Sequence, residues 1–241
     1  MTIQVQADAE ATARAGAAFI AAKEREAIAE RGRFIMAVSG GRDPWRMLSL
    51  LGGEPVTWEA VQVVQVDERV APAGDPDRNL THLGEALIAH GPLRPQQVHA
   101  MPVEEMDLEA AAAKYDELLR QIAGSPPVLD LVHLGLGPDG HTASLVPGDP
   151  VLQVTDRNVA LTGIYQRHAR MTLTYPMLNR ARCILWLATG PQKAEILQRL
   201  AGGDPSIPAS RIRRDTALVL ADRAAAGDAT SMDSKGTALP R

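Results

Sequence analysis

Cysteine is almost absent from this chain of 241 residues, which contains only Cys183. One cysteine cannot form an internal disulfide, and its position in the apolar run CILWLA predicts a buried, inert thiol in a reducing compartment. No window approaches about 18 uninterrupted apolar residues, and no basic stretch followed by an apolar one stands at the N-terminus. We therefore expect a cytoplasmic, soluble protein with no membrane partner.

Excess positive charge is missing as well, because the formal net charge is −4. A nucleic-acid-binding surface needs a basic excess on one face, so we expect no nucleic-acid partner. The six histidines show no H-E-x-x-H motif and no paired i, i+4 spacing, and the lone cysteine rules out a thiolate site, so no metal is expected. The G-x-S-x-G elbow of serine hydrolases is also absent.

Apolar residues make up 45% of the sequence, enough for a sizeable core. Short apolar or alternating runs predict strands, and amphipathic spacing predicts helices between most of them. The predicted strands span residues 33–38, 61–66, 129–134, 158–162, 171–175, 183–188 and 216–220. The predicted helices span residues 8–31, 80–89, 107–123 and 191–201. Alternation of strand and helix predicts an α/β fold with a largely parallel sheet flanked by helices.

No linker, repeat or charge block divides the chain, so we predict a single α/β domain over residues 1–225. Residues 226–241 are small and polar, and we expect them to form a mobile C-terminal tail. The sequence does not determine the oligomeric state, and a monomer is favoured.

Residues 131–145 read LVHLGLGPDGHTASL and satisfy the dinucleotide-binding pattern G-x-G-x-x-G. That pattern indicates a dinucleotide only where a long helix leaves the glycines and an acidic residue closes the next strand. Pro147 and Pro150 cut any helix here to about two turns. Asp156 precedes the next apolar run instead of closing it. The context therefore disfavours a nucleotide site, and we expect no organic cofactor.

Polar residues gather after the predicted strands. In a parallel sheet, ligands bind at the carboxyl ends of the strands, where loops and helix N-termini converge. The turn SGG after residue 38 is either a plain strand-to-helix connection, with Asp43 as helix cap, or a phosphate cradle. His133 stands inside an apolar strand and is expected to pack there, whereas His141 lies in a loop without an apolar stripe. The strand ends carry Ser39, Asp67, Glu68, Arg69, Asp139, His141 and Lys193.

Five longer segments, spread from roughly residue 10 to residue 224, together carry a resemblance to a known family. They read VSGGRDPWRML, VQVDERVAPAGDPDRN, LGLGPDGHTASLVPG, RMTLTYPMLNRARCILWLATGPQKAEIL and PASRIRRDTALVLAD. In these segments the chain resembles the 6-phosphogluconolactonase family. The third segment is the most specific. The related glucosamine-6-phosphate deaminases continue their D-G-H loop toward an Ala-Phe-Asn-Glu-Pro ending, whereas Ala143, Ser144, Leu145 and Pro147 follow here.

The resemblance implies a three-layer, Rossmann-like α/β fold without a nucleotide. It implies hydrolysis of 6-phospho-D-glucono-1,5-lactone to 6-phospho-D-gluconate, the second step of the oxidative pentose phosphate pathway, with that phosphorylated sugar lactone as binding partner and no cofactor. It assigns catalysis to His141, Asp139, Asp67 and Arg69. It assigns substrate binding to Ser39, Gly40, Gly41, Arg42, Asn79, Gly137, Arg170 and Lys193. The sequence departs from the family pattern at Arg42, Asp43 and Arg78, and Arg42 would add positive charge to the phosphate site.

The chemistry of lactone hydrolysis suits these side chains. A histidine with an ordinary pKa of about 6.5 accepts a proton from water and returns one to the departing ring oxygen. Asp139 would fix the tautomer of His141, and Arg69 or glycine-turn amides would stabilise the oxyanion. Two alternatives stay open. A sugar-phosphate isomerase or deaminase would use Asp67 for proton transfer between carbons, and a sugar-phosphate sensor would bind without turnover.

The predicted tail gives a first test. Residues 226–241 lack an apolar stripe, so deletion of residues 228–241 should leave the melting temperature nearly unchanged. Thermal unfolding of the full and the shortened chain measures the difference. A fall of more than about 5 °C, equivalent to roughly 1.5–2.5 kcal/mol for a domain of this size, would mean that the tail packs against the domain.

Overall fold

Seven parallel strands form the central sheet, in the order β1–β10–β9–β6–β2–β3–β5. They are β1 (Thr2–Gln6), β2 (Phe34–Val38), β3 (Val61–Gln65), β5 (Val98–His99), β6 (Leu131–Gly135), β9 (Ile184–Ala188) and β10 (Ala217–Asp222). Their direction confirms the predicted α/β fold with a largely parallel sheet. The structure, a computed structural model, describes residues 1–89 and 91–227, so residues 228–241 of the predicted tail lie outside the described residues.

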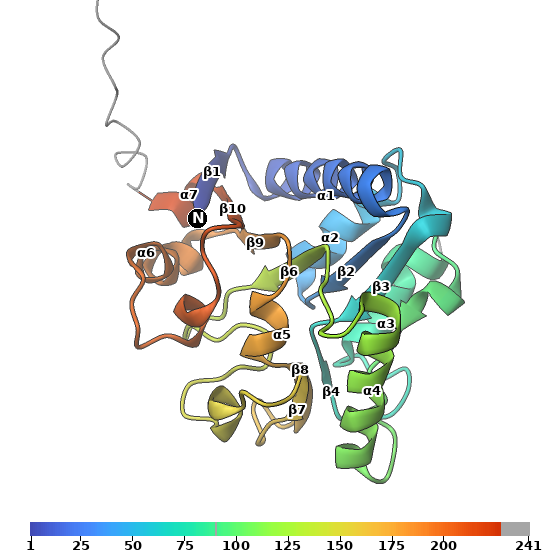
Figure 1. Ribbon diagram of the computed structural model, residues 1–241. Coiled ribbons are helices and arrows are strands. Elements are labelled where there is room, and N and C mark those ends of the chain that lie inside the picture. Colours follow the sequence, from blue (N-terminus) through green and yellow to red (C-terminus); the bar gives the residue numbers. More distant parts are fainter. Residues whose placement is uncertain (90, 228–241) are drawn as a thin grey trace, which may run out of the picture.

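Helices cover both faces of the sheet and give the fold three layers. They are α1 (Ala9–Arg31), α2 (Arg42–Leu51), α3 (Asn79–Leu83), α4 (Leu108–Ala123), α5 (Tyr175–Asn179), α6 (Ala194–Gly202) and α7 (Arg223–Ala226). The helices α1 and α2 pack on one face, and α4, α5 and α6 pack on the other (Figure 1). No helix within the described ranges is long and apolar enough to cross a membrane.

Burial on both faces explains the continuous apolar run of β2. Phe34, Met36 and Val38 pack with α1 and α2, while Ile35 and Ala37 pack with the helices of the opposite layer. Successive side chains of a strand point to opposite faces, so a strand between two helical layers needs apolar residues at every position. This is why the sequence predicted β2 within one residue of its observed start.

The helix ends follow local signals, with one exception. Asp8 caps α1 by accepting the N–H of Ala11 at 2.8 Å, and Gly32 ends that helix in the left-handed region with φ 69°. The expectation that Asp43 caps α2 is wrong, because the glycine turn starts the helix earlier and places Gly41 at the N-cap. The carboxylate of Asp43 instead accepts a hydrogen bond from the Thr189 hydroxyl.

Two predicted helices are interrupted. The segment 80–89 begins as α3 and continues as a π-helical turn over Gly84–Ala89. The segment 191–201 begins as a 3₁₀ turn over Pro191–Lys193, and α6 follows it. Both segments are helical throughout, so the sequence predicted their positions but not the change in winding.

A separate three-stranded sheet departs from the prediction. It contains β4 (Asp67–Arg69), β8 (Arg170–Leu173) and β7 (Val159–Leu161), all paired antiparallel. The sequence predicted β7 and β8 as strands without indicating a second sheet, and it placed residues 67–69 at the end of a strand. Antiparallel neighbours need no helical crossover, so alternation of strands and helices does not reveal them.

Glu68 joins β4 to the start of α3. Its fully buried carboxylate accepts the backbone N–H groups of Asn79, Leu80 and Arg69, each at 2.8 Å. The side-chain amide of Gln65 donates a further hydrogen bond at 2.8 Å. The first N–H groups of a helix have no partner within the helix, so this carboxylate satisfies donors that would otherwise be buried alone.

Arg78 supplies the charge that balances Glu68. Its side chain is only 2% exposed, its Nε lies 3.5 Å from a carboxylate oxygen of Glu68, and it also pairs with Glu104. Arg78 does not line the cavity at the carboxyl ends of β2, β6 and β9, which is described below. The departure from the family pattern at this position therefore concerns the support of α3 and adds no cation to the predicted phosphate site.

Replacement of Glu68 by glutamine tests this support. The amide nitrogen of a Glu68→Gln side chain cannot accept the N–H groups of α3, and Arg78 loses a buried partner. We expect a loss of about 2–4 kcal/mol in unfolding free energy and a melting temperature lower by about 5–15 °C. Glu104→Gln, at the half-exposed partner of Arg78, serves as control and should cost less than about 1 kcal/mol. Equal melting temperatures for Glu68→Gln and the parent would refute this account.

Candidate active site

A cavity of about 420 Å³ opens at the carboxyl ends of β2, β6 and β9. The strand order runs from β2 through β3 to β5 on one side and from β6 through β9 to β10 on the other. Loops diverge where the strand order reverses in this way, and ligands bind in the crevice that results. Every residue that the family resemblance assigned to catalysis or substrate binding, except Asp139, lines this cavity. They are Ser39, Gly40, Gly41, Arg42, Asp67, Arg69, Asn79, Gly137, His141, Arg170 and Lys193.

Asp139 and His141 occupy the loop after β6. Nδ1 of His141 lies 2.5 Å from Oδ1 of Asp139, which also accepts the backbone N–H of His141 at 3.1 Å. Desolvation alone would raise the pKa of Asp139, but the hydrogen bonds and charge of His141 outweigh it and lower that pKa. An ionised Asp139 keeps the proton of a neutral imidazole on Nδ1, so Nε2 is the nitrogen that can accept a proton.

The glycines of the G-x-G-x-x-G pattern close this loop around the imidazole. A Cβ at Gly137 would lie 2.1 Å from Nδ1 of His141, and the Gly137 N–H donates to the carbonyl of His141 at 2.9 Å. Gly140 adopts φ 82°, and a Cβ there would lie 2.4 Å from the Cβ of Ile207. These glycines therefore allow a turn and a close approach that no larger residue permits.

Asp67 has both carboxylate oxygens engaged. Oδ2 accepts the hydroxyl of Ser144 at 2.5 Å and lies 3.8 Å from Nη1 of Arg170. Oδ1 accepts the side-chain amide of Asn79 at 3.4 Å, and the same amide donates to the backbone carbonyl of Asp67 at 2.9 Å. The buried carboxylate thus holds Arg170 and Asn79 in place at the cavity wall.

Several side-chain atoms of residues that line the cavity have no hydrogen-bond partner in the described part of the chain. Two arginines of the cavity have partners for only part of each guanidinium. Arg170 donates to the carbonyl of Tyr165 at 3.4 Å, and Arg69 donates to the carbonyl of Asp77. Nε of Arg69, Nε of Arg170 and the hydroxyl of Ser39 are buried, and none of them has a hydrogen-bond partner among residues 1–89 and 91–227. Buried polar atoms are generally hydrogen-bonded, so unpartnered donors around a cavity indicate a ligand rich in acceptor oxygens.

The turn Ser39–Gly41 leads from β2 into α2. A Cβ at Gly40 would lie 1.9 Å from Oδ1 of Asn79, so only glycine fits there. The first N–H groups of α2 have no partner within the helix, and the helix dipole makes this end partly positive. Arg42 adds a guanidinium at the mouth of the cavity, where its side chain is 91% exposed. The turn and the helix start together can bind an anion.

Lys193 reaches the cavity from the turn before α6. Its Nζ donates to the carbonyl of Leu136, and burial lowers the pKa of Lys193 while nearby carboxylates oppose that shift. Thr189 and Gln192 of the same segment also line the cavity, although the sequence did not select them. The sequence could have indicated both residues, because they belong to the polar run TGPQK that directly follows β9.

His133 packs inside β6, as expected. Its Nδ1 accepts the N–H of Ser39 at 3.4 Å, and complete burial lowers the pKa of His133 to about 3. The imidazole is therefore neutral over the working pH range. Through its hydrogen bond to Ser39, the imidazole stabilises the Ser39–Gly41 turn, and it adds no charge to the cavity.

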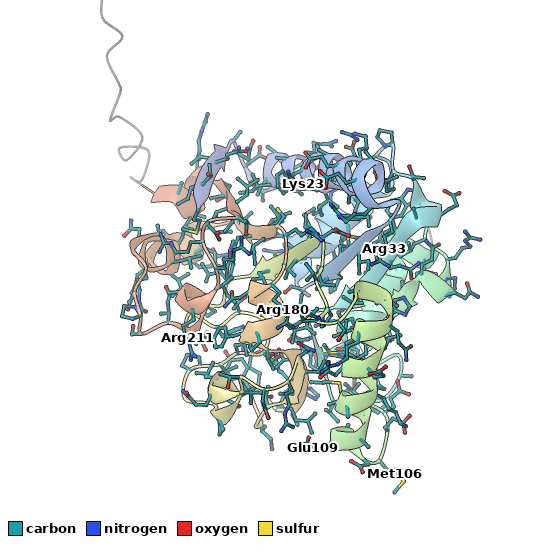
Figure 2. The ribbon with its side chains drawn as sticks, viewed as in Figure 1. Lys23, Arg33, Met106, Glu109, Arg180 and Arg211 are labelled. Carbon is teal, nitrogen blue, oxygen red and sulfur yellow. The ribbon has the colours of Figure 1, made fainter. Side chains whose placement is uncertain are left out.

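A second hollow of about 400 Å³ lies at the amino ends of β6 and β9. Lys23 and Arg180, labelled in Figure 2, are among the basic residues that line it. Lys23 pairs with Glu26 at 2.7 Å and Arg31 pairs with Asp130 at 3.0 Å. None of the unpartnered buried side-chain atoms in the described part of the chain belongs to this hollow. The same described residues contain no group of three or more His, Cys, Asp or Glu side chains placed to hold a metal ion.

The fold and the site define a Rossmann-like α/β protein with a cavity lined by cationic side chains where its strand order reverses. The family model described as "Glucosamine-6-phosphate isomerases/6-phosphogluconolactonase" matches residues 7–220. The chain belongs to this family, which confirms the resemblance found in the sequence.

Similar proteins cover nearly the whole chain. A 6-phosphogluconolactonase of Streptomyces coelicolor is 36% identical over 242 residues, which cover 92% of each chain. The solved structure of a 6-phosphogluconolactonase from Trypanosoma brucei is 25% identical, with a TM-score of 0.82 over 93% of this chain and 97% of that one. A monomeric glucosamine-6-phosphate deaminase shares the fold at 20% identity, with a TM-score of 0.81 over 94% of this chain and 99% of that one.

Proposed function

We propose that this protein hydrolyses 6-phospho-D-glucono-1,5-lactone to 6-phospho-D-gluconate, as a 6-phosphogluconolactonase of cytoplasmic carbohydrate metabolism. The observation that carries the proposal is the ionised Asp139 held against Nδ1 of His141 at a cavity that also holds Arg69, Arg170 and Lys193. Ester hydrolysis needs a base for water, and the phosphate needs cations. Relatives that bear the name 6-phosphogluconolactonase support the same assignment.

His141 acts as the general base in this reaction. Its Nε2 takes a proton from water while the water oxygen bonds to the lactone carbonyl carbon. Asp139 stabilises the imidazolium without taking the proton itself. The bond from the carbonyl carbon to the ring oxygen then breaks, and the imidazolium returns its proton to that oxygen. The open-chain acid loses its carboxyl proton to solvent.

The remaining residues bind and orient the substrate. Arg69 and the amides of a glycine turn stabilise the oxyanion. The phosphate binds to the turn Ser39–Gly41 and the start of α2, with positive charge from Arg42, Arg170 and Lys193. Asn79 and Gly137 complete the wall, and Asp67 positions Arg170. All these residues belong to one chain, so we propose that the monomer is active.

The two alternatives make different demands on the same cavity. An isomerase or deaminase would need the Asp67 carboxylate for proton transfer between carbons, but both of its oxygens are engaged by Ser144, Asn79 and Arg170. A sensor would not need an imidazole oriented by a carboxylate. The fold does not separate these alternatives, because a deaminase shares it. The side-chain contacts favour the lactonase.

Acid release from freshly prepared 6-phospho-D-glucono-1,5-lactone, measured above spontaneous hydrolysis, tests the proposal. Glucosamine 6-phosphate is assayed beside it. Accelerated release without reaction of the amino sugar supports the lactonase. Reaction of glucosamine 6-phosphate instead would favour the deaminase, and tight binding of 6-phospho-D-gluconate without any acceleration would favour the sensor.

His141→Asn separates binding from chemistry. We expect kcat to fall by about 10²–10⁴-fold, the usual contribution of a positioned base, while the affinity for 6-phospho-D-gluconate stays close to that of the parent. Activity of the parent should decline at low pH as the imidazole becomes protonated, and the residual rate of the variant should lack that decline. His82→Asn, which lies outside the cavity, is the control. Equal kcat values for parent and His141→Asn would remove His141 from the mechanism.

Lys193→Ala tests the phosphate site. Charge-assisted hydrogen bonds contribute about 1.5–3 kcal/mol, so kcat/KM for the phosphorylated lactone should fall about 10–100-fold. The activity on unphosphorylated gluconolactone should change much less. Lys114→Ala removes the same charge from the exposed face of α4 and should leave both activities unchanged. A Lys193→Ala protein that retained the parent's preference for the phosphorylated lactone would contradict the assignment.

A further inference from the structure

The loop between β7 and β8 makes a tight turn beside the cavity. The N–H of Tyr165 donates to the carbonyl of His168 at 2.9 Å, and the reverse hydrogen bond measures 3.3 Å. Gln166 and Arg167 between them adopt φ 48° and φ 73°, a region that residues with side chains enter rarely. The imidazole of His168 and the guanidinium of Arg167 hold the turn to the carboxylate of Asp77 at 3.1 Å and 3.3 Å. Tyr165 is thus presented in one defined position.

Tyr165 contacts both members of the Asp139–His141 pair. Its hydroxyl donates to Oδ2 of Asp139 at 3.1 Å, on the oxygen that His141 does not use. Its ring meets the imidazole edge to face, with 5.2 Å between centroids and 67° between planes. Both carboxylate oxygens are therefore engaged, and the carboxylate cannot rotate away from His141 without breaking a hydrogen bond.

The same tyrosine contacts the principal buried cation of the cavity. The guanidinium carbon of Arg170 lies 5.1 Å from the centroid of the Tyr165 ring, within the range of a cation–π interaction. Nη2 of Arg170 also donates to the Tyr165 carbonyl at 3.4 Å. One residue therefore touches the group that activates water and the group that binds the substrate anion.

We propose that Tyr165 is a positioning residue that fixes the Asp139–His141 pair relative to Arg170. The inference rests on the proposed lactone hydrolysis and adds a residue to it. The Tyr165 hydroxyl fixes the position of the Asp139 carboxylate, which in turn orients the His141 imidazole. The ring and the backbone carbonyl of Tyr165 fix the position of the Arg170 guanidinium. The lactone carbon and the phosphate of one substrate are then held at a constant separation from their partners, which is the condition for a reactive geometry.

Tyr165 remains a donor throughout the useful pH range. Burial raises the pKa of Tyr165, and the hydrogen bond to the Asp139 carboxylate raises it further, while the charge of Arg170 opposes this. Two other charged groups act on Asp139 or respond to it. The charge of His141 lowers the pKa of Asp139, and the charge of Asp139 opposes the lowering of the Lys193 pKa by burial. The phenol therefore keeps its proton and its hydrogen bond to Asp139 at every pH below the ordinary tyrosine pKa of about 10.

Tyrosine variants separate the two contacts. Tyr165→Phe keeps the ring and removes the hydroxyl, so Asp139 interacts more strongly with the protonated imidazole but is less well oriented. We expect kcat to fall about 10-fold, KM to change less than about twofold, and the acid limb of the pH profile to move up by about half a pH unit. Tyr165→Leu also removes the ring beside Arg170 and should raise KM about 10-fold.

Tyr175→Phe is the matched control. Its hydroxyl donates to the carbonyl of Pro208 at 2.9 Å and lies outside the cavity, so the variant loses a buried hydrogen bond of similar kind. Any effect of this variant should be confined to the melting temperature, with kcat, KM and the pH profile equal to those of the parent. Movement of the acid limb in Tyr175→Phe would count against a specific role for Tyr165.

An NMR titration of the His141 ring protons in the free protein gives a readout without turnover. The midpoint should move to higher pH in Tyr165→Phe and stay in place in Tyr175→Phe. An active parent whose kcat and His141 midpoint are both unchanged by Tyr165→Phe would overturn the proposal. A parent without lactonase activity whose midpoint still moves would support the contact and reject the proposed function instead.

Discussion

The carboxylate of Glu68 is the interaction on which the geometry of the cavity depends. It satisfies the first N–H groups of α3 and the N–H of Arg69 together, in a position closed to water. The helix start and β4 are therefore fixed to each other, which places Asp67, Arg69 and Asn79 on one wall. The amide of Asn79 in turn leaves room for nothing larger than glycine at position 40. A buried acid that does not line the cavity thus shapes the turn Ser39–Gly41.

Other cationic and imidazole side chains of the site are held by charged or polar partners. Asp139 holds His141, Asp67 holds Arg170, and a backbone carbonyl holds Lys193. These partners fix the side chains when the chain folds, so the cost of ordering and partly desolvating them is part of the free energy of folding. In the proposed lactonase mechanism, such preorganised charges and dipoles would stabilise the charge that develops during the reaction with little rearrangement.

Two physical rules predicted that polar side chains such as Ser39, His141 and Lys193 would gather. Buried parallel strands are continuous apolar runs, and their carboxyl ends share one edge, so polar residues after β2, β6 and β9 had to meet. Asn79 and Arg170, by contrast, were assigned only through the family resemblance. The strand β1 was missed because TIQVQ is largely polar at the sheet edge, and β5 because it has only two residues. Tyr165 was missed because its contacts join separate loops. A single aromatic residue in a polar segment carries no periodic signal.

The pairing of β1 with β10 bears on the order in which the protein is made. Thr2–Gln6 can join the sheet only after Leu218–Asp222 has left the ribosome. The strands β2, β3, β5 and β6 all precede residue 136, so a nascent chain can assemble that half of the sheet earlier. Arg170 and Lys193 lie in the part of the chain that follows these four strands. The strands that carry the turn Ser39–Gly41 can thus pair with each other before these two cations reach the cavity.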